Sequence, residues 1–327
     1  VGACDAIMLG KLSQDAMSAV SLATQVTFVF NLFMFAFMAG ENMFVAQYYG
    51  KGDYTGISQV FSLVTKICGC IAVVFLAGTL FFPEQLMRIL TNEETLIVLG
   101  SEYLRVIGIS YVFSGIAQIF LAIMKNCGAV NMSTLINGVM VILNIVLNAV
   151  FIFGLSGFPK MGIKGAAIGT LTARSLEFLI VLFYVAKIDK KVRVFDGGLL
   201  RGTFTAENRK LCRDFIKVST PVILSGLVWA ISIPMQTAIL GHLSSDAIAA
   251  NSVATTFFQY LKVIVVAIAS ASSVVIGKSI GQGDRNEVKA VGRTLSVIDI
   301  SIGIILAIVL LMLRKPLLSM YNLTEEA

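Results

Sequence analysis

Long apolar segments separated by short polar ones follow one another along almost the whole chain. Eight of them are long enough to cross the roughly 30 Å hydrocarbon core of a bilayer as helices. They are expected near residues 16–48, 58–82, 98–124, 130–154, 163–187, 214–240, 248–277 and 291–313, and a ninth, shorter segment precedes Gly10. The pattern therefore predicts an all-α polytopic membrane protein.

A stretch near the start of the chain recurs 231 residues later. Residues 9–19 (LGKLSQDAMSA) and 240–250 (LGHLSSDAIAA) are identical at seven of eleven positions, and the register holds to the Gly-x-Gly-Asp sequences at 50–53 and 281–284. Repeats of several helices are common in secondary transporters. We expect two six-helix repeats that form N- and C-terminal lobes. We interpret both Gly-x-Gly-Asp sequences as turns, because they follow helices and lack the glycine spacing of a phosphate-binding loop.

The repeat register also predicts that the chain is a piece of a longer protein. With the second copy's first helix starting near Asp214, the register places about 18 residues before residue 1 and about 117 residues, with three helices, after residue 327. The expected parts are an N-terminal lobe over 1–187, a basic linker over 188–213 and a truncated C-terminal lobe over 214–327.

The composition agrees with a membrane protein and gives it an orientation. Apolar residues make up 57% of the chain and charged residues only 13%, against about a quarter in soluble domains. If the Gly-x-Gly-Asp turns are cytoplasmic, fifteen of the 25 Lys and Arg residues lie on that side, which is the positive-inside pattern. The net charge of +6 therefore reflects topology, including a cytoplasmic basic linker, and not a nucleic-acid partner. The five scattered cysteines indicate neither a disulfide framework nor a metal site.

Polar residues inside the apolar segments are the candidates for function, because polar groups in hydrocarbon are costly. Asp5 lies in the outer half of the first helix, where a desolvated carboxyl group could bind and release a proton; its counterpart in the second repeat is Gln236. Asn144 and Asn148 share one helical face at a spacing of four. They could hold a cation or substrate, or they could be hydrogen-bonding contacts between helices.

Further candidates lie on the following segments. Gly162 to Thr170 is rich in small residues, which favours a close-packing surface to which Thr170 adds a hydroxyl group. Arg174 and Glu177 can neutralise each other at a spacing of three. Lys262 lies too deep in its segment to reach the membrane surface easily and is a functional candidate. Three other polar residues are explained more simply by packing, by snorkelling or by a loop position: Lys66, His242 and Asp299.

Several of these stretches, in order, resemble the multidrug and toxic compound extrusion (MATE) family. They are Asp5 to Gly10 with Asp15, Ala16 and Ala19, Val45 to Asp53, Asn144 to Gly154, and Phe158 to Ala167. The resemblance implies twelve helices in two lobes around a V-shaped cavity, and export of organic, often cationic, compounds in exchange for protons or sodium. Asp5 matches the family's first-helix acid, proposed to couple proton binding to movement of the N-terminal lobe; Asn144 matches a polar residue of the same cluster, and Thr170 another.

Two departures from the family pattern affect the choice of ion. The chain has Asn148 where many members have an aspartate, and it lacks the seventh-helix glutamate of another branch. A sodium site at Asp5, Asn144 and Asn148 would have only one carboxylate, so we expect proton coupling over sodium coupling. Lys262 would repel a cationic substrate unless an acid neutralised it.

The repeat and this resemblance together imply a monomeric, cation-coupled multidrug antiporter in a prokaryotic plasma membrane, with lipid and a small organic substrate as partners and no cofactor beyond H⁺ or Na⁺. A lipid-linked oligosaccharide or polysaccharide flippase of the same superfamily is the nearest alternative, and a more cationic cavity would indicate it. A channel would conduct without obligatory exchange. A membrane-embedded enzyme would need a nucleophile with a base, or a metal cluster, and the sequence shows neither.

Overall fold

The computed structural model describes residue 5 and residues 8–188, 206–241 and 245–318, which are almost entirely helical and contain no strand. The helices of these ranges are α2 (Gln14–Lys51), α3 (Tyr54–Phe81), α4 (Pro83–Leu90), α5 (Glu94–Asn126), α6 (Val130–Phe153), α7 (Gly162–Phe183), α8 (Ala206–Gly241), α9 (Ser245–Gln282) and α10 (Arg285–Leu318). Eight of them are long and apolar enough to span a membrane. The predicted all-α, multi-pass membrane fold is confirmed.

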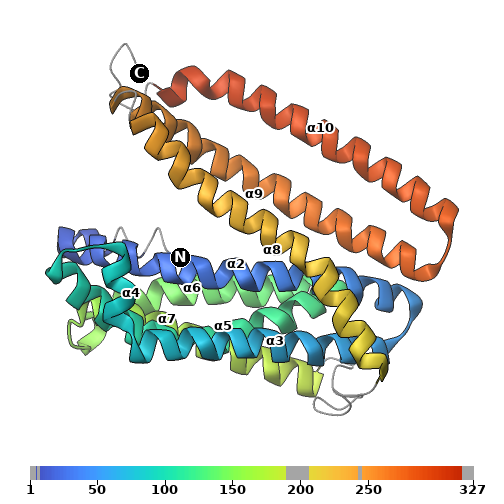
Figure 1. Ribbon diagram of the computed structural model, residues 1–327, viewed down its shortest axis with the longest axis horizontal. Coiled ribbons are helices and arrows are strands. Elements are labelled where there is room, and N and C mark those ends of the chain that lie inside the picture. Colours follow the sequence, from blue (N-terminus) through green and yellow to red (C-terminus); the bar gives the residue numbers. More distant parts are fainter. Residues whose placement is uncertain (1–4, 6–7, 189–205, 242–244, 319–327) are drawn as a thin grey trace. The chain divides into compact units, whose positions relative to one another are not determined.

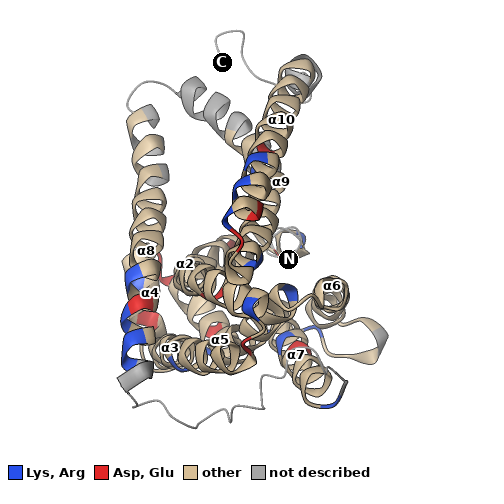
Figure 2. Cartoon of the chain, turned by 90° about the vertical axis from the view of Figure 1, so that its right-hand side faces the viewer, with Lys and Arg blue, Asp and Glu red and all other residues tan. Residues whose placement is uncertain are grey.

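Each of the eight full-length segments expected in the membrane coincides with one of these helices, whereas the shorter segment before Gly10 lies mostly outside the described residues. Two features were not expected. The short helix α4 begins with Pro83 at its first position, where the missing N–H costs nothing, and carries Glu84 and Arg88. Helix α8 begins at Ala206, inside the stretch assigned to the linker. Figure 2 shows Lys and Arg concentrated near the start of α8 and uncharged residues along the rest of the helix.

The chain forms two compact units that do not follow the repeat boundaries. Unit 1 contains residues 1–45 and 53–223, and unit 2 contains residues 46–52 and 224–327. In unit 1, α3, α4, α6 and α7 all pack against α5, which is the most buried of the spanning helices. The helices α2, α3, α5, α6 and α7 run side by side, as Figure 1 shows. In unit 2, α9 packs against α10.

Both Gly-x-Gly-Asp sequences form turns that end one helix and begin the next, as predicted. Gly52 and Gly283 have φ angles of 76° and 86°, which only glycine adopts without strain. The side chain of Asp53 accepts a hydrogen bond from the Gly56 N–H at 2.9 Å, and that of Asp284 accepts one from the Asn286 N–H at 2.8 Å. Each aspartate thus satisfies backbone donors that a helix start leaves unpaired.

The small residues at the start of α7 let this helix lie close to α6. A Cβ atom at Gly165 would overlap the backbone of Phe151, and one at Gly169 would overlap the side chain of Asn148. The predicted close-packing surface is therefore confirmed. It also brings Thr170 next to the polar face of α6.

Candidate functional site

Four polar residues predicted from the sequence meet inside unit 1. Asn148 of α6 donates from Nδ2 to Oδ1 of Asp5 at 2.7 Å. The same nitrogen lies 3.4 Å from Oδ1 of Asn144, one turn earlier on α6, and 3.4 Å from Oγ1 of Thr170 on α7. Asp5, Asn144 and Asn148 are 6%, 3% and 0% exposed. A single amide donor therefore lies at the centre of three oxygens.

The cluster retains hydrogen-bonding capacity that its own members do not use. Oδ1 of Asn148 and Nδ2 of Asn144 are buried and have no hydrogen-bond partner. An unpaired buried polar atom is costly, and such atoms are rare in folded proteins. The cluster therefore leaves one acceptor and one donor for another group.

Asp5 and Thr170 line a cavity of about 590 Å³ that lies wholly within unit 1. Its wall combines aromatic rings, methionines and small polar groups, and its described lining residues are Asp5, Thr24, Thr27, Phe28, Phe30, Asn31, Met34, Phe35, Met38, Tyr103, Ile107, Ser110, Tyr111, Ser114, Gly115, Gln118, Thr170 and Arg174. Rings present flat apolar faces, and methionine side chains adapt to irregular shapes. Such a wall suits organic molecules of varied shape.

Helix α5 supplies a polar stripe to this cavity that the sequence reasoning missed. Ser110, Ser114 and Gln118 recur every four residues and therefore share one face of the helix. Tyr111 lies beside them, stacks on Phe30 with ring centroids 4.6 Å apart, and shares a hydrogen bond of 2.9 Å with Thr27. The regular spacing of polar residues in an apolar segment was the signal that could have identified this face.

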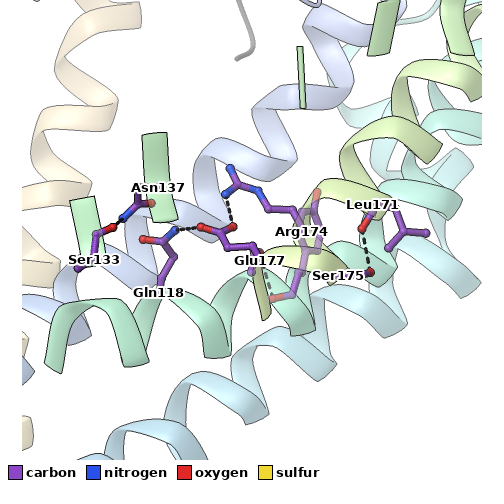
Figure 3. A network of polar contacts seen from close by, with 9 residues as sticks. Gln118, Ser133, Asn137, Leu171, Arg174, Ser175 and Glu177 are labelled. Atoms are coloured by element: carbon purple, nitrogen blue, oxygen red, sulfur yellow. Dashed lines mark hydrogen bonds and ion pairs between the residues drawn. The ribbon is translucent and has the colours of Figure 1, made fainter. Parts of the chain in front are cut away.

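The ion pair predicted between Arg174 and Glu177 is present. Nη1 of Arg174 lies 2.7 Å from Oε2 of Glu177, and Nε2 of Gln118 donates to Oε1 of Glu177 at 3.4 Å (Figure 3). Glu177 is fully buried, whereas the Arg174 side chain is 30% exposed and lines the cavity. The cavity wall therefore carries Asp5 and an arginine whose charge is already paired.

The candidates of the second repeat lie in unit 2. Gln236 lines a separate, open pocket of about 330 Å³ together with Ser232, Met235 and Ile239. Nζ of Lys262 lies 3.7 Å from the ring centroid of Trp229, which is a cation–π contact. The contact stabilises this ammonium group but leaves its positive charge in place.

Asp299, Lys66 and His242 are the polar residues for which the sequence analysis expected no functional role. Asp299 accepts a hydrogen bond from Ser272 at 3.4 Å, between α9 and α10. Lys66 is half-buried on α3. His242 lies outside the described residues. Within those residues, no group of three or more His, Cys, Asp or Glu side chains could hold a metal ion.

The sequence matches the MatE family over residues 1–150 and 221–327. It is 24% identical over 315 residues to the probable multidrug resistance protein YoeA of Bacillus subtilis, covering 96% of this chain and 67% of that protein. It is also 24% identical over 323 residues to the probable multidrug resistance protein NorM of Thermotoga maritima, covering 98% of this chain and 68% of the relative. The chain thus spans about two thirds of the length of these relatives.

Comparison with solved structures also finds transporters with a similar fold. The fold is similar to the outward-facing conformation of a multidrug resistance MATE family transporter of the MOP superfamily, with a TM-score of 0.83, 20% identity, and coverage of 96% of this chain and 68% of that one. A MOP superfamily transporter from Pyrococcus furiosus, described as having a binding pocket of reverse polarity that suggests a different function, gives a TM-score of 0.81 at 19% identity, covering 98% of this chain and 70% of that one. At these identities the likeness concerns the fold alone.

Proposed function

The chain belongs to the MatE family, and we propose that it is part of a proton-coupled antiporter that exports organic, often cationic, compounds by alternating access. It would act in a prokaryotic plasma membrane with its basic loops in the cytoplasm. The observation that carries the proposal is the hydrogen bond between Asn148 and Asp5 at the wall of an aromatic cavity. A proton-binding group and a surface for organic molecules thus adjoin within one unit.

The arrangement of the cluster supports a proton over sodium as the coupling ion. Sodium would need several oxygen atoms turned toward one point, as hard cations generally do. In this cluster the amide nitrogen of Asn148 lies among the oxygens of Asp5, Asn144 and Thr170, where a cation would have to lie. A proton needs only one oxygen of Asp5 and a path for water, which the cavity provides.

The charges of the cavity wall support drug export over the flippase alternative. A flippase for anionic lipid-linked sugars would be expected to have a cationic cavity. The charged residues that line the described cavity are Asp5 and Arg174, and Arg174 is paired with Glu177. One acid and one neutralised base favour a cationic or neutral organic substrate.

The proposal is tested by dye efflux from membrane vesicles that contain the full-length protein. Efflux is measured with a pH gradient, with a sodium gradient and with neither. Asp5→Asn keeps the shape of the side chain but removes its titration, so pH-driven efflux should be lost while insertion is normal. Asp15→Asn, at an exposed position in the first turn of α2, is the matched control and should retain wild-type efflux. Wild-type efflux from the Asp5→Asn protein would exclude Asp5 as the coupling residue.

A further inference from the structure

Glu41, in the membrane helix α2, is a buried acid that the candidate site does not use. It is 0% exposed, and neither carboxylate oxygen has a hydrogen-bond partner. None of the ion pairs among the described residues includes it. It does not line the cavity that contains Asp5, whose lining on α2 ends at Met38. Sequence reasoning passed over this residue, although it is an acid inside an apolar segment.

The first half of α8 covers the turn of α2 that carries Glu41. Phe215 of α8 packs between Phe37 and Phe44, with ring centroids 6.2 Å and 6.0 Å away. A Cβ atom at Gly40 would lie 3.1 Å from the ring of Phe215. Positions 37, 40, 41 and 44 follow the spacing of one helical face, so Glu41 adjoins this contact. All of these residues belong to unit 1.

The other groups near Glu41 are polar but uncharged. Ser219, one turn after Phe215, is fully buried, contacts the turn at Gly40, and has a hydroxyl oxygen without a partner. Cys68 of α3 is buried and close enough for the charge of Glu41 to act on its thiol group. This thiol is a titratable group beside Glu41. On the next residue of α2, Asn42 accepts a hydrogen bond of 2.7 Å from Asn126 of α5. No described cation offsets the charge of Glu41.

A carboxylate ion in these surroundings would cost several kcal/mol, because burial removes its water and nothing replaces it. The neutral acid therefore fits this packing, and the ion does not. The ion would fit only if water reached the carboxyl group. The contact between α2 and the first half of α8 covers the turn that carries Glu41, so separation of these two segments would let water reach that turn.

We propose that Glu41 is a second proton-binding site, covered by the first half of α8 in this conformation and opened to water when α8 separates from α2. This inference rests on the proposed proton-coupled transport. When α8 moves away, the acid gives its proton to water and becomes a carboxylate. Before α8 can close again, the carboxylate takes a proton back. Closure of this contact thus requires a proton at Glu41, separately from the proton at Asp5.

Carbodiimide labelling tests the site without relying on transport. A carbodiimide adds to a protonated carboxyl group and, after rearrangement, remains attached as an N-acylurea, which mass spectrometry locates. Membrane-soluble dicyclohexylcarbodiimide should label Glu41 in the wild type, and labelling should decrease as the pH rises. A water-soluble carbodiimide should label Glu41 only in Phe215→Ala, which removes part of the cover. The exposed Glu94 provides the control for the water-soluble reagent, which reaches it equally in the wild type and in Phe215→Ala.

Transport measurements test the role of the site. Glu41→Gln should insert normally, because it replaces a neutral acid by a neutral amide, and should lose most of its pH-driven efflux. Glu41→Asp keeps a titratable group and should recover part of that efflux, while Glu94→Gln should behave as the wild type. Two results would overturn this inference and leave the proposed function intact. In the first, the wild type shows pH-driven efflux but Glu41 is not labelled at any pH. In the second, Glu41→Gln shows normal efflux. A wild type without pH-driven efflux overturns the proposed function and this inference together.

Discussion

Gly50 and Gly281, which are 231 residues apart, each lie against the backbone of the other's helix within unit 2. A Cβ atom at Gly50 would overlap the carbonyl group of Lys278, and one at Gly281 would overlap the carbonyl group of Gln47. Gln47 and Lys278 are themselves 231 residues apart. The end of α2 and the end of α9 thus make a reciprocal contact that follows the repeat, with Ala46 and the equivalent Gly277 also facing each other.

The first prediction is that Gly281→Val will weaken this contact, because the added side chain has no room beside the Gln47 carbonyl group. The measurement is disulfide formation between Ala46→Cys and Gly277→Cys, in a background without the native cysteines. A Cβ at position 277 lies 2.7 Å from that of Ala46, so a small separation gives disulfide geometry. Cross-linking should decrease in Gly281→Val and should be unchanged in Gly303→Val, where no atom lies within 4 Å. Equal cross-linking in both proteins would contradict the glycine contact.

The second prediction concerns the glycine that makes room for Asn148. A Cβ atom in Gly169→Ala would overlap Oδ1 of Asn148, so the amide must move and its hydrogen bond to Asp5 must weaken. We expect a loss of about 1 to 3 kcal/mol in stability, as for other overpacked cores, together with reduced pH-driven efflux. Thermal unfolding in detergent and vesicle efflux measure the two effects. Gly138→Ala on α6, where the added methyl group meets no atom, is the control and should be neutral or slightly stabilising. Full efflux from Gly169→Ala would show that the position of Asn148 does not matter.

Most of the fold could be predicted from the sequence because the bilayer imposes a simple rule. Each spanning helix needs a long apolar segment, and the breaks fall at residues such as Gly52 and Asp53, whose backbone and side-chain preferences form turns. The extension of α8 back to Ala206 could not be predicted this way, because polar residues that continue a helix beyond the membrane leave no hydrophobic signal. The short helix α4 lacks that signal for the same reason.

Contacts of the candidate site could be predicted when both residues lie on one helix. Contacts between residues on different helices were harder to predict. Asn144 and Asn148 follow from their spacing of four, and Arg174 and Glu177 from their spacing of three. The contact between Gln118 and Glu177 joins residues far apart in sequence, on α5 and α7, and no local pattern encodes it. The family resemblance supplied the association of Asp5 with Asn144, which α6 and its hydrogen bonds now account for physically.

The third prediction uses the paired charges beside the cavity. Glu177→Ala leaves Arg174 without its acid, at a position that is 30% exposed, and Gln118 without its acceptor. Breaking such a largely buried pair should cost about 3 kcal/mol, and Arg174→Gln with Glu177→Gln together should cost less than Glu177→Ala alone. Thermal unfolding of the single and double variants decides this. Glu177→Gln should also raise the KM for cationic dyes more than for neutral ones, because the freed guanidinium group repels cations from the cavity wall. Equal changes for both dye classes would contradict the charge argument.

The fourth prediction concerns the choice of ion and follows from the amide at position 148. Asn148→Asp replaces the donor at the centre of the cluster by a second carboxylate, 2.7 Å from Asp5 in the present packing. Two carboxylates at that distance cannot both remain charged without a cation between them, so they share a proton or bind a metal ion. A second charge and the oxygens of Asn144 and Thr170 would form a better sodium site than the wild type offers.

We therefore expect efflux by Asn148→Asp to depend on a sodium gradient at fixed pH, while wild-type efflux follows the pH gradient and ignores sodium. Asn137→Asp, at a partly buried position on the same helix outside the cluster, serves as the control for an added charge on α6. Wild-type transport that follows sodium and ignores the pH gradient would reverse the assignment, and it would mean that one carboxylate and neutral oxygens suffice to bind the ion.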